Sequence, residues 1–268
     1  MEEPHLTGTP NQEIHIWRVP LHQPQNLADR LEGLLDPEEK ERAARFHFAE
    51  DRIRYTIAHG ALRTILGQYL NQAPADLSFR RGRFGKPCLS VPTEARGRNR
   101  AAGLHGSRGA SAPASTPQGL HFNLSHCRDL AVIAVSSGRL VGVDVEAVRD
   151  VGKLDSIVKR YFSPEEKRFL ASAAPREHPR ALVTLWSRRE AAAKALGLDL
   201  SAALATVNVP VYPPGGSVEV PSLADIKTDG GERRPVWFIR DLGLDEGHVG
   251  AVCHEGRQIP VVYRDFGG

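Results

Sequence analysis

Residues 140–146, Leu-Val-Gly-Val-Asp-Val-Glu, form the most apolar strand pattern in this chain of 268 residues. Alternate side chains of a strand point to opposite faces, so Asp144 and Glu146 share one face. Two carboxylates this close repel each other on a core strand unless a cation lies between them. A hard divalent ion such as Mg²⁺ takes oxygen ligands of this kind. The pattern therefore indicates either a metal-binding strand or a strand end at which both acids are solvated.

The two halves of the chain repeat one pattern. Three segments of the first half resemble three segments of the second, in the same order and at nearly constant spacing: an alternating strand, a helix start and a glycine-terminated helix end. Both helix starts have a capping side chain, proline at the first helical position and glutamate at the third. The sequence therefore predicts a duplication. The paired segments are residues 14–19 and 141–146, 36–40 and 163–167, and 61–67 and 191–197.

The repeated unit reads as a strand, a capped helix, a longer helix and a meander of strands. This order predicts an α+β fold with pseudo-twofold duplicated lobes, each a small, mostly antiparallel sheet packed against helices. We place the lobes at residues 1–138 and 139–268, with residues 260–264 as the last strand of the second meander. Residues 92–119 are rich in Arg, Gly, Ala, Ser and Pro and are predicted to form a flexible surface loop. Ligand sites favour interfaces between lobes, so we expect the site there.

The amino-acid composition limits the classes of protein to which this chain can belong. Hydrophobic residues make up 41% and charged residues 25% of the chain, and no apolar run reaches the roughly 20 residues of a membrane span. The first residues lack a signal-peptide pattern, so we expect a cytoplasmic protein. The three cysteines lie far apart and offer neither a disulfide framework nor a metal knuckle. A net charge of +3 does not indicate nucleic acid binding, although it is compatible with anionic partners.

A predicted helix carries a second set of functional residues. Trp186, Glu190 and Lys194 are four residues apart, so they line one face of this helix. On its own, this pattern is equally typical of an exposed Glu–Lys pair. Together with the acidic strand, it predicts three carboxylates around one metal ion and a lysine one turn away. Such an arrangement suits a bound diphosphate.

Two further clusters are typical of anion binding. Residues 122–126, Phe-Asn-Leu-Ser-His, form a short apolar strand that ends in a hydroxyl and an imidazole. Residues 80–89 are cationic and contain two glycines, so side chains and backbone together can surround an anion. The structural alternatives are a turn with a surface histidine in the first case and a charged hairpin in the second.

In this order, the four clusters resemble the 4'-phosphopantetheinyl transferases of the double-length, surfactin-activating type. The resemblance covers about residues 36–200. Each motif alone is common, but the four in family order are specific. Known members have two similar lobes with the active site between them. The resemblance rests on Gly85-Lys86-Pro87, Phe122-Asn123-Leu124-Ser125-His126, Gly142-Val143-Asp144-Val145-Glu146 and Trp186-Ser187-Arg188-Arg189-Glu190-Ala191-Ala192-Ala193-Lys194.

The resemblance implies a reaction and its partners. Such an enzyme transfers the phosphopantetheine arm of coenzyme A to a serine of an apo acyl, peptidyl or aryl carrier protein. It uses Mg²⁺, with Mn²⁺ as an alternative, and releases adenosine 3',5'-bisphosphate. The carrier protein is expected to be acidic. A chain of double length is expected to act as a monomer, because the second lobe replaces a neighbouring subunit.

The resemblance also implies a role for individual residues. Asp144, Glu146 and Glu190 would hold the Mg²⁺, and Glu190 would also accept the serine proton as a catalytic residue. Lys194, the second catalytic residue, would contact the phosphates and neutralise the leaving oxygen. The remaining residues would bind coenzyme A: Ser125 and His126 at the 3'-phosphate, Arg81 and Lys86 at the nucleotide phosphates, and Arg42 at the nucleotide.

Two positions depart from the family pattern. Arg189 stands where the family usually has lysine, and an arginine would transfer protons poorly, which favours Glu190 as the base. Cys127 stands where some relatives have a polar residue near the metal, so a water is expected to take that ligand position. Two other functions fit the same residues: a Mg²⁺-dependent hydrolase of nucleotide diphosphates, and a non-catalytic coenzyme A-binding protein.

Overall fold

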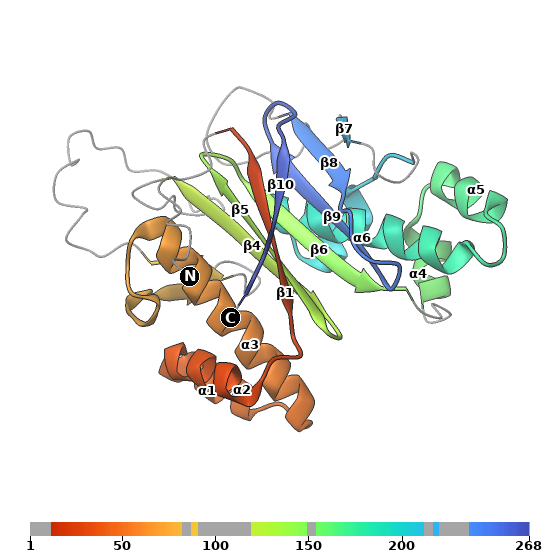
Figure 1. Cartoon of the computed structure of the whole chain (residues 1–268). Coiled ribbons are helices and arrows are strands. Elements are labelled where there is room, and N and C mark those ends of the chain that lie inside the picture. Colours follow the sequence, from red (N-terminus) through yellow and green to blue (C-terminus); the bar gives the residue numbers. More distant parts are fainter. Residues whose placement is uncertain are drawn as a thin grey trace.

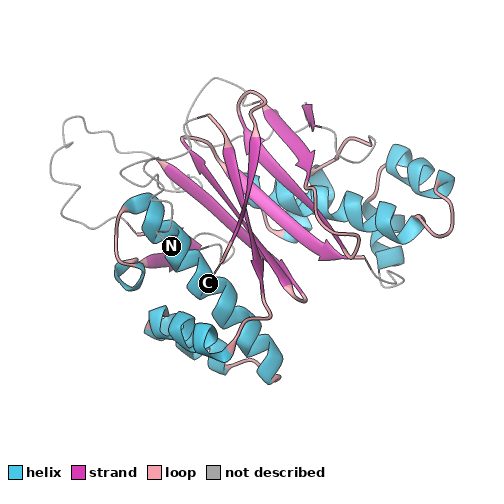
Figure 2. Ribbon diagram, viewed as in Figure 1, coloured by secondary structure: helices cyan, strands magenta, loops and turns pink. Residues whose placement is uncertain are grey.

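The computed structural model describes residues 12–81, 87–90, 119–148, 154–211, 217–219 and 236–267. Two four-stranded sheets form the centre of the molecule, and helices cover their outer sides (Figure 1). Figure 2 shows the same separation of helices and strands into layers. This arrangement confirms the predicted α+β fold of two lobes, each a sheet packed against helices. None of the helices within these ranges is both long and apolar enough to span a membrane.

The first sheet has the strand order β10-β1-β5-β4. Trp17 and Ile133 on its outer face pack against Ile57 and Leu62 of the long helix α3. The elements of this lobe are β1 (Ile14–Pro20), α1 (Gln25–Leu34), α2 (Pro37–Ala44), α3 (Ala49–Leu70), the short helix η1 (Pro74–Asp76), the hairpin β2 (Phe79–Arg81) and β3 (Pro87–Leu89), β4 (Leu120–Cys127) and β5 (Leu130–Ser137).

The second sheet has the strand order β6-β9-β8-β7 and is antiparallel throughout. Ile239 and Ala251 on its outer face pack against Leu185 and Ala192 of helix α6. The elements in the second half of the chain are β6 (Val141–Ala147), α4 (Asp155–Tyr161), α5 (Pro164–Ser172), α6 (His178–Leu196), α7 (Leu200–Thr206), β7 (Ser217–Glu219), β8 (Trp237–Asp241), β9 (His248–Glu255) and β10 (Val261–Asp265), of which β10 joins the first sheet.

The last strand does not remain in the second sheet. The sequence pattern places residues 260–264 in the second meander, but β10 pairs in parallel with β1 of the first sheet, with Ile14 opposite Val261. Strand β5 pairs with the other edge of β1. The C-terminal strand thereby covers an edge that would otherwise expose unpaired backbone groups. The predicted loop at 92–119 lies outside the described residues except for Gly119.

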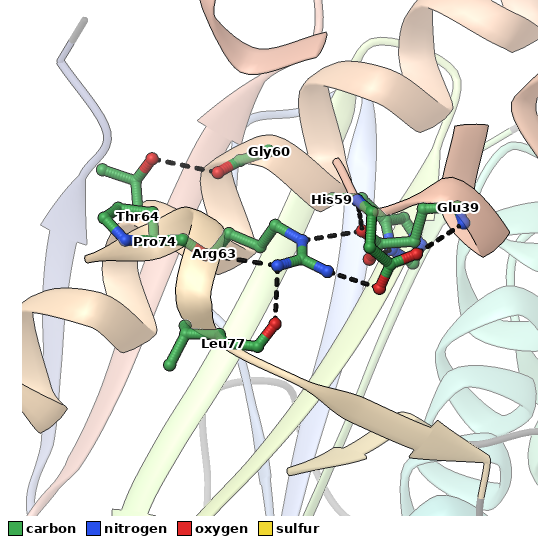
Figure 3. Close-up of polar contacts among 8 residues, drawn as sticks. Glu39, His59, Gly60, Arg63, Thr64, Pro74 and Leu77 are labelled. Atoms are coloured by element: carbon green, nitrogen blue, oxygen red, sulfur yellow. Dashed lines mark hydrogen bonds and ion pairs between the residues drawn. The ribbon is translucent and has the colours of Figure 1, made fainter. Parts of the chain in front are cut away.

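Both predicted helix starts are capping boxes, and each continues into a buried ion pair. Glu39 closes the box of α2 and also accepts a hydrogen bond from Arg63 of α3 at 2.7 Å (Figure 3). Glu166 closes the box of α5 and accepts two hydrogen bonds from Arg189 of α6 at 2.6 and 2.7 Å. The duplication therefore includes the anchoring of each long helix to the capped helix before it.

Helix α6 lies directly on strand β6 at Gly142. A methyl group at this position would overlap the carbonyl oxygen of Ala191 and the amide nitrogen of Ala195, both of which are backbone atoms of α6. The buried hydroxyl of Ser187 donates to the carbonyl oxygen of Asp144 at 3.3 Å, one turn earlier on the helix. Small residues on both elements therefore bring the helix close to the acidic strand.

Replacing Gly142 with alanine tests this contact. Because the added methyl group meets backbone rather than flexible side chain, we expect Gly142→Ala to lower the free energy of unfolding by about 3 kcal/mol or more. Urea denaturation measures the change. The control is Gly33→Ala in α1, where nothing lies within 4 Å of the new methyl group and a gain of about 0.5–1 kcal/mol is expected. Equal effects of the two substitutions would contradict the packing described.

Candidate functional site

Three elements bring their polar side chains together at Asp144. This residue of β6 is 3% exposed, and its Oδ1 accepts hydrogen bonds from Lys194 Nζ of α6 at 2.7 Å and from Ser125 Oγ of β4 at 2.9 Å. Lys194 Nζ also donates to Ser125 Oγ at 3.0 Å. Strand β4, strand β6 and helix α6 thus meet in one triangle of side-chain contacts.

The edges of β4 and β6 lie side by side and are joined through side chains. Asn123 Oδ1 accepts a hydrogen bond from the backbone nitrogen of Val143 at 2.8 Å, and Cys127 Sγ accepts one from the backbone nitrogen of Ala147 at 3.1 Å. Asn123, Ser125 and Cys127 are two residues apart, so all three face β6. The junction between the two lobes therefore passes through the candidate site.

The acidic side chains fit a cation. Asp144 Oδ2 is buried and has no hydrogen-bond partner among the described residues. Burial raises the pKa of the Glu190 carboxyl, and the negative charges of Asp144 and Glu146 raise it further, while Lys194 opposes them. In the described ranges, no three Asp, Glu, His or Cys side chains are arranged so that they could already hold a metal ion. The repulsion and the unpartnered oxygen are what a bound divalent ion would relieve.

His126 lies near cationic groups of the helices α2, α3 and α6. Part of its surface faces solvent, yet the surrounding protein lowers its pKa. The positive charges of His59, Lys194 and Arg42 lower this pKa further, and Asp51 partly offsets them. The cationic groups of α2 and α3 are therefore close enough to act on the strand that carries Ser125.

A cavity of about 50 Å³ lies between α2, α3 and the β2–β3 hairpin. Arg42 lines this cavity and also a wider groove of about 620 Å³ along α2. Two of the predicted coenzyme A residues are not placed: Lys86 lies outside the described residues, and of Arg81 only the backbone is described. The cavity is lined by Asp36, Glu38, Glu39, Arg42, Tyr55, His59, Phe79, Arg80 and Pro87.

Arg189 has a structural role in this structure. Its side chain is 2% exposed and binds Glu166, which is also buried. It also donates to the carbonyl oxygen of Val207 and lies over the ring of Phe162. Cys127 likewise has a backbone partner, as described above. On the helix motif, Lys194 contacts Asp144 and Glu190 is influenced by the charge of Asp144, whereas Arg189 binds Glu166.

Sequence patterns did not identify three residues of the cavity wall. Glu39, Tyr55 and His59 line the cavity, but the sequence indicated only that Glu39 caps a helix. One signal was present: Tyr55, His59 and Arg63 are four residues apart on α3, the same spacing as Trp186, Glu190 and Lys194 on α6. The residues that contact this face of α3 depend on the position of α2, and the spacing along α3 does not reveal that position.

Comparisons with known proteins agree with this geometry. The chain matches the 4'-phosphopantetheinyl transferase superfamily over residues 140–236 and the N-terminal region of 4'-phosphopantetheinyl transferases over residues 23–138. It is 34% identical to the 4'-phosphopantetheinyl transferase HetI of Nostoc sp., over 91% of this chain and 88% of that protein. The chain belongs to the 4'-phosphopantetheinyl transferase superfamily.

Other relatives extend the similarity across most of this transferase. A 4'-phosphopantetheinyl transferase of Bacillus subtilis is 30% identical over 90% of the chain and 92% of its own length. The transferase Sfp of Bacillus subtilis is 25% identical over 87% of both chains. The similarity thus includes both lobes and the strands and helix that form the candidate site.

Arg189→Lys tests whether this arginine stabilises the fold or takes part in the site. Lysine keeps the charge but loses the paired hydrogen bonds to Glu166, so we expect the free energy of unfolding to fall by about 1–3 kcal/mol. Denaturation in urea gives this value, with Arg168→Lys on the exposed face of α5 as control. Unchanged stability together with lost transferase activity would place Arg189 in the site after all.

Glu190→Gln tests the electrostatic cost of the acidic cluster. The pKa of Glu190 is raised in the folded state, so its protonated form adds stability at acidic pH that is lost as pH rises through the folded pKa. At about pH 7 the variant should therefore be more stable than the parent, and at about pH 4 this advantage should shrink. Denaturation at both pH values measures it, with Glu32→Gln on α1 as control. A variant less stable at neutral pH would exclude the proposed repulsion.

Proposed function

We propose that this transferase moves the 4'-phosphopantetheine arm of coenzyme A to a serine of an apo carrier protein in a Mg²⁺-dependent reaction. The observation that carries the proposal is the contact triangle of Asp144, Lys194 and Ser125, with an unpartnered carboxylate oxygen and Glu190 beside it. Carboxylates, a lysine and a hydroxyl at the end of a strand are groups that can together bind a diphosphate and its counter-ion.

Asp144, Glu146 and Glu190 are the residues that would hold Mg²⁺. When bound, the ion would neutralise negative charge on the diphosphate. The fit rests on the buried Oδ2 of Asp144 and on the mutual repulsion that raises the pKa of Glu190. Glu146 contributes to that repulsion, which supports its place in the same set.

Glu190 is the proposed base. A carboxylate positioned beside the attacking hydroxyl can accept its proton as a general base. The serine hydroxyl attacks the phosphorus that bears the pantetheine arm and gives its proton to Glu190. The bond from that phosphorus to the bridging oxygen breaks, and adenosine 3',5'-bisphosphate leaves with the electron pair. Lys194, already held by Asp144 and Ser125, neutralises charge on the leaving oxygen.

The phosphates of coenzyme A would bind along the cationic side of the junction. Ser125 and His126 are the proposed partners of the 3'-phosphate, and Arg42 lies close enough to influence the charge of His126. Arg81 and Lys86 stay proposed contacts of the nucleotide phosphates on the strength of their motif. We also propose that the chain acts as a monomer, because residues of both lobes build one site.

Mass spectrometry of an apo carrier protein incubated with the enzyme, coenzyme A and Mg²⁺ tests the function. We expect the carrier mass to rise by one phosphopantetheine arm. Asp144→Ala should reduce the initial rate at least about a hundredfold, because it removes a carboxylate that would hold the metal ion and that positions Lys194 and Ser125. Asp29→Ala, at an exposed position of α1, should leave the rate unchanged.

The same assay separates the alternatives. Phosphopantetheine released from coenzyme A without a carrier would indicate a hydrolase. Coenzyme A binding without transfer to any acyl or peptidyl carrier would indicate a non-catalytic binding protein. Transfer that is undiminished in Asp144→Ala would refute the metal assignment but leave the enzyme class intact.

A further inference from the structure

Strands β4 and β6 end together, next to the candidate site. Cys127, the last residue of β4, accepts a hydrogen bond from the backbone nitrogen of Ala147, the last residue of β6. On the other edge of β6, Ala147 lies opposite His248, the first residue of β9. His248 is buried and has no role in the proposed reaction. A buried histidine therefore lies at the end of the junction between the two lobes.

The second lobe holds His248 through both its ring and its backbone. The ring nitrogen Nδ1 lies 2.9 and 3.1 Å from the two carboxylate oxygens of Asp245. The hydrogen bond from His248 is the largest cause of the lowered pKa of Asp245. Arg180 of α6 donates hydrogen bonds to the carbonyl oxygens of His248 and Glu246. The ring is thus fixed relative to β9 and α6, and Nε2 is left to face the first lobe.

The first lobe meets this ring with Asp129. Its Oδ1 lies 3.2 Å from His248 Nε2, which is within ion-pair distance although not in hydrogen-bond geometry. Asp129 lies in the two-residue turn between Cys127 and Leu130, which joins β4 to β5. The contact closes a ring of neighbours, because Cys127 binds Ala147, Ala147 lies opposite His248, and His248 contacts the turn that follows β4.

The turn between β4 and β5 needs support from its neighbours. Arg128, its first residue, has a φ of 53°, in a region that glycine favours and other residues rarely adopt. Such a conformation persists where the surrounding structure holds it. Besides the contact with His248, Leu21 donates from its backbone nitrogen to the carbonyl oxygen of Asp129 at 2.7 Å. Contacts from β9 and from the segment after β1 thus fix the turn from two sides.

Two other interpretations of this cluster have less support. One histidine and two acids could bind a metal ion, but among the residues that the structure describes no such group is arranged to do so. The second alternative is an ordinary surface ion pair, which contributes little to stability. Here the side chain of His248 is 8% exposed and that of Asp129 is 53% exposed, so one partner is fixed inside the protein. We therefore expect the contact to act on the position of the turn more than on overall stability.

The position of the turn matters because two proposed coenzyme A contacts lie just before it. Ser125 and His126 are near the end of β4, and Ser125 also donates to Asp144 of β6 at 2.9 Å. A turn that moved away from β9 would carry both groups away from β6. Lys194 would keep its own hydrogen bond to Asp144, which is 2.7 Å long.

From these contacts we propose that His248 is a positioning residue, which together with Asp129 holds the end of β4 against β6 and keeps Ser125 in place for coenzyme A. The inference rests on the proposed function, because it assumes that Ser125 and His126 bind this substrate. His248 and Asp129 act through the turn and do not touch the reacting atoms. Their loss should therefore weaken the use of coenzyme A without removing a catalytic group.

Steady-state kinetics of phosphopantetheine transfer, at saturating apo carrier protein and Mg²⁺, test the proposal on the full chain. The variants are Asp129→Ala, His248→Ala and the double variant. We expect each single substitution to raise the KM for coenzyme A about fivefold, and the double variant to show about the same rise, because all three lose one and the same contact. The kcat should change less than about twofold, since Lys194 keeps its contact with Asp144.

Arg139→Ala is the matched control. Arg139 precedes β6 and donates to the carbonyl oxygen of Glu255, the last residue of β9, at 3.1 Å. The substitution removes a contact at the opposite end of the same two strands, so KM and kcat should stay within about twofold of the parent values. Asp129 is half-exposed, so Asp129→Ala keeps the test decisive if His248→Ala does not fold.

Hydrogen exchange gives a second measurement that does not depend on activity. His248→Ala leaves the sequence of residues 120–137 unchanged, so faster exchange of their amides reports a loosened β4–β5 hairpin. We expect faster exchange in this segment for His248→Ala and no change for Arg139→Ala.

The outcomes separate this inference from the proposed function. If the unmodified enzyme transfers the arm but the single substitutions leave the KM for coenzyme A unchanged, the role of His248 is wrong and the transferase function stands. Independent effects that multiply to about 25-fold in the double variant, or unchanged exchange in the hairpin, lead to the same conclusion. If the unmodified protein transfers nothing to a carrier, the proposed function fails and this inference fails with it.

Discussion

The close contact between helix α6 and strand β6 at Gly142 is the constraint on which the site depends. Because the backbone of Ala191 and Ala195 occupies the space of a side chain at Gly142, the helix cannot move away without opening the second lobe's core. The same contact sets Lys194 against Asp144 and brings Glu190 within reach of its charge. The free energy of core packing therefore maintains an acidic cluster that is unfavourable by itself.

The site also depends on a junction between the two sheets that directs polar side chains toward Asp144. Asn123 and Cys127 bind backbone amides of β6 through their side chains, and between them Ser125 is directed at Asp144. A continuous backbone ladder would pair these edges without presenting a hydroxyl to the site. The duplication supplies the rest: each long helix is anchored by a buried arginine to a capping-box glutamate, and the two helices approach the junction from opposite lobes (Figure 1).

Local patterns predicted much of the fold and of the site. Strand alternation, capping boxes and helical spacing depend on neighbours in sequence, so they revealed both halves, the acidic strand and the face of Glu190 and Lys194. Contacts between elements that lie far apart in the sequence could not be predicted from these local patterns. Nothing local indicates that β10 crosses to β1, that Arg189 turns to Glu166, or that Glu39 holds His59. In each case the partner lies on another element, and burial decides the pairing.

The central claim is that one junction binds both the metal ion and coenzyme A. A crystal of the protein grown with coenzyme A and Mn²⁺, with data collected at the manganese absorption edge, tests it most directly. The account predicts an anomalous peak next to Asp144 Oδ2 and the Glu190 carboxylate, with the diphosphate of coenzyme A at the same ion. A peak on other side chains, or coenzyme A bound away from β4 and α6, would contradict it.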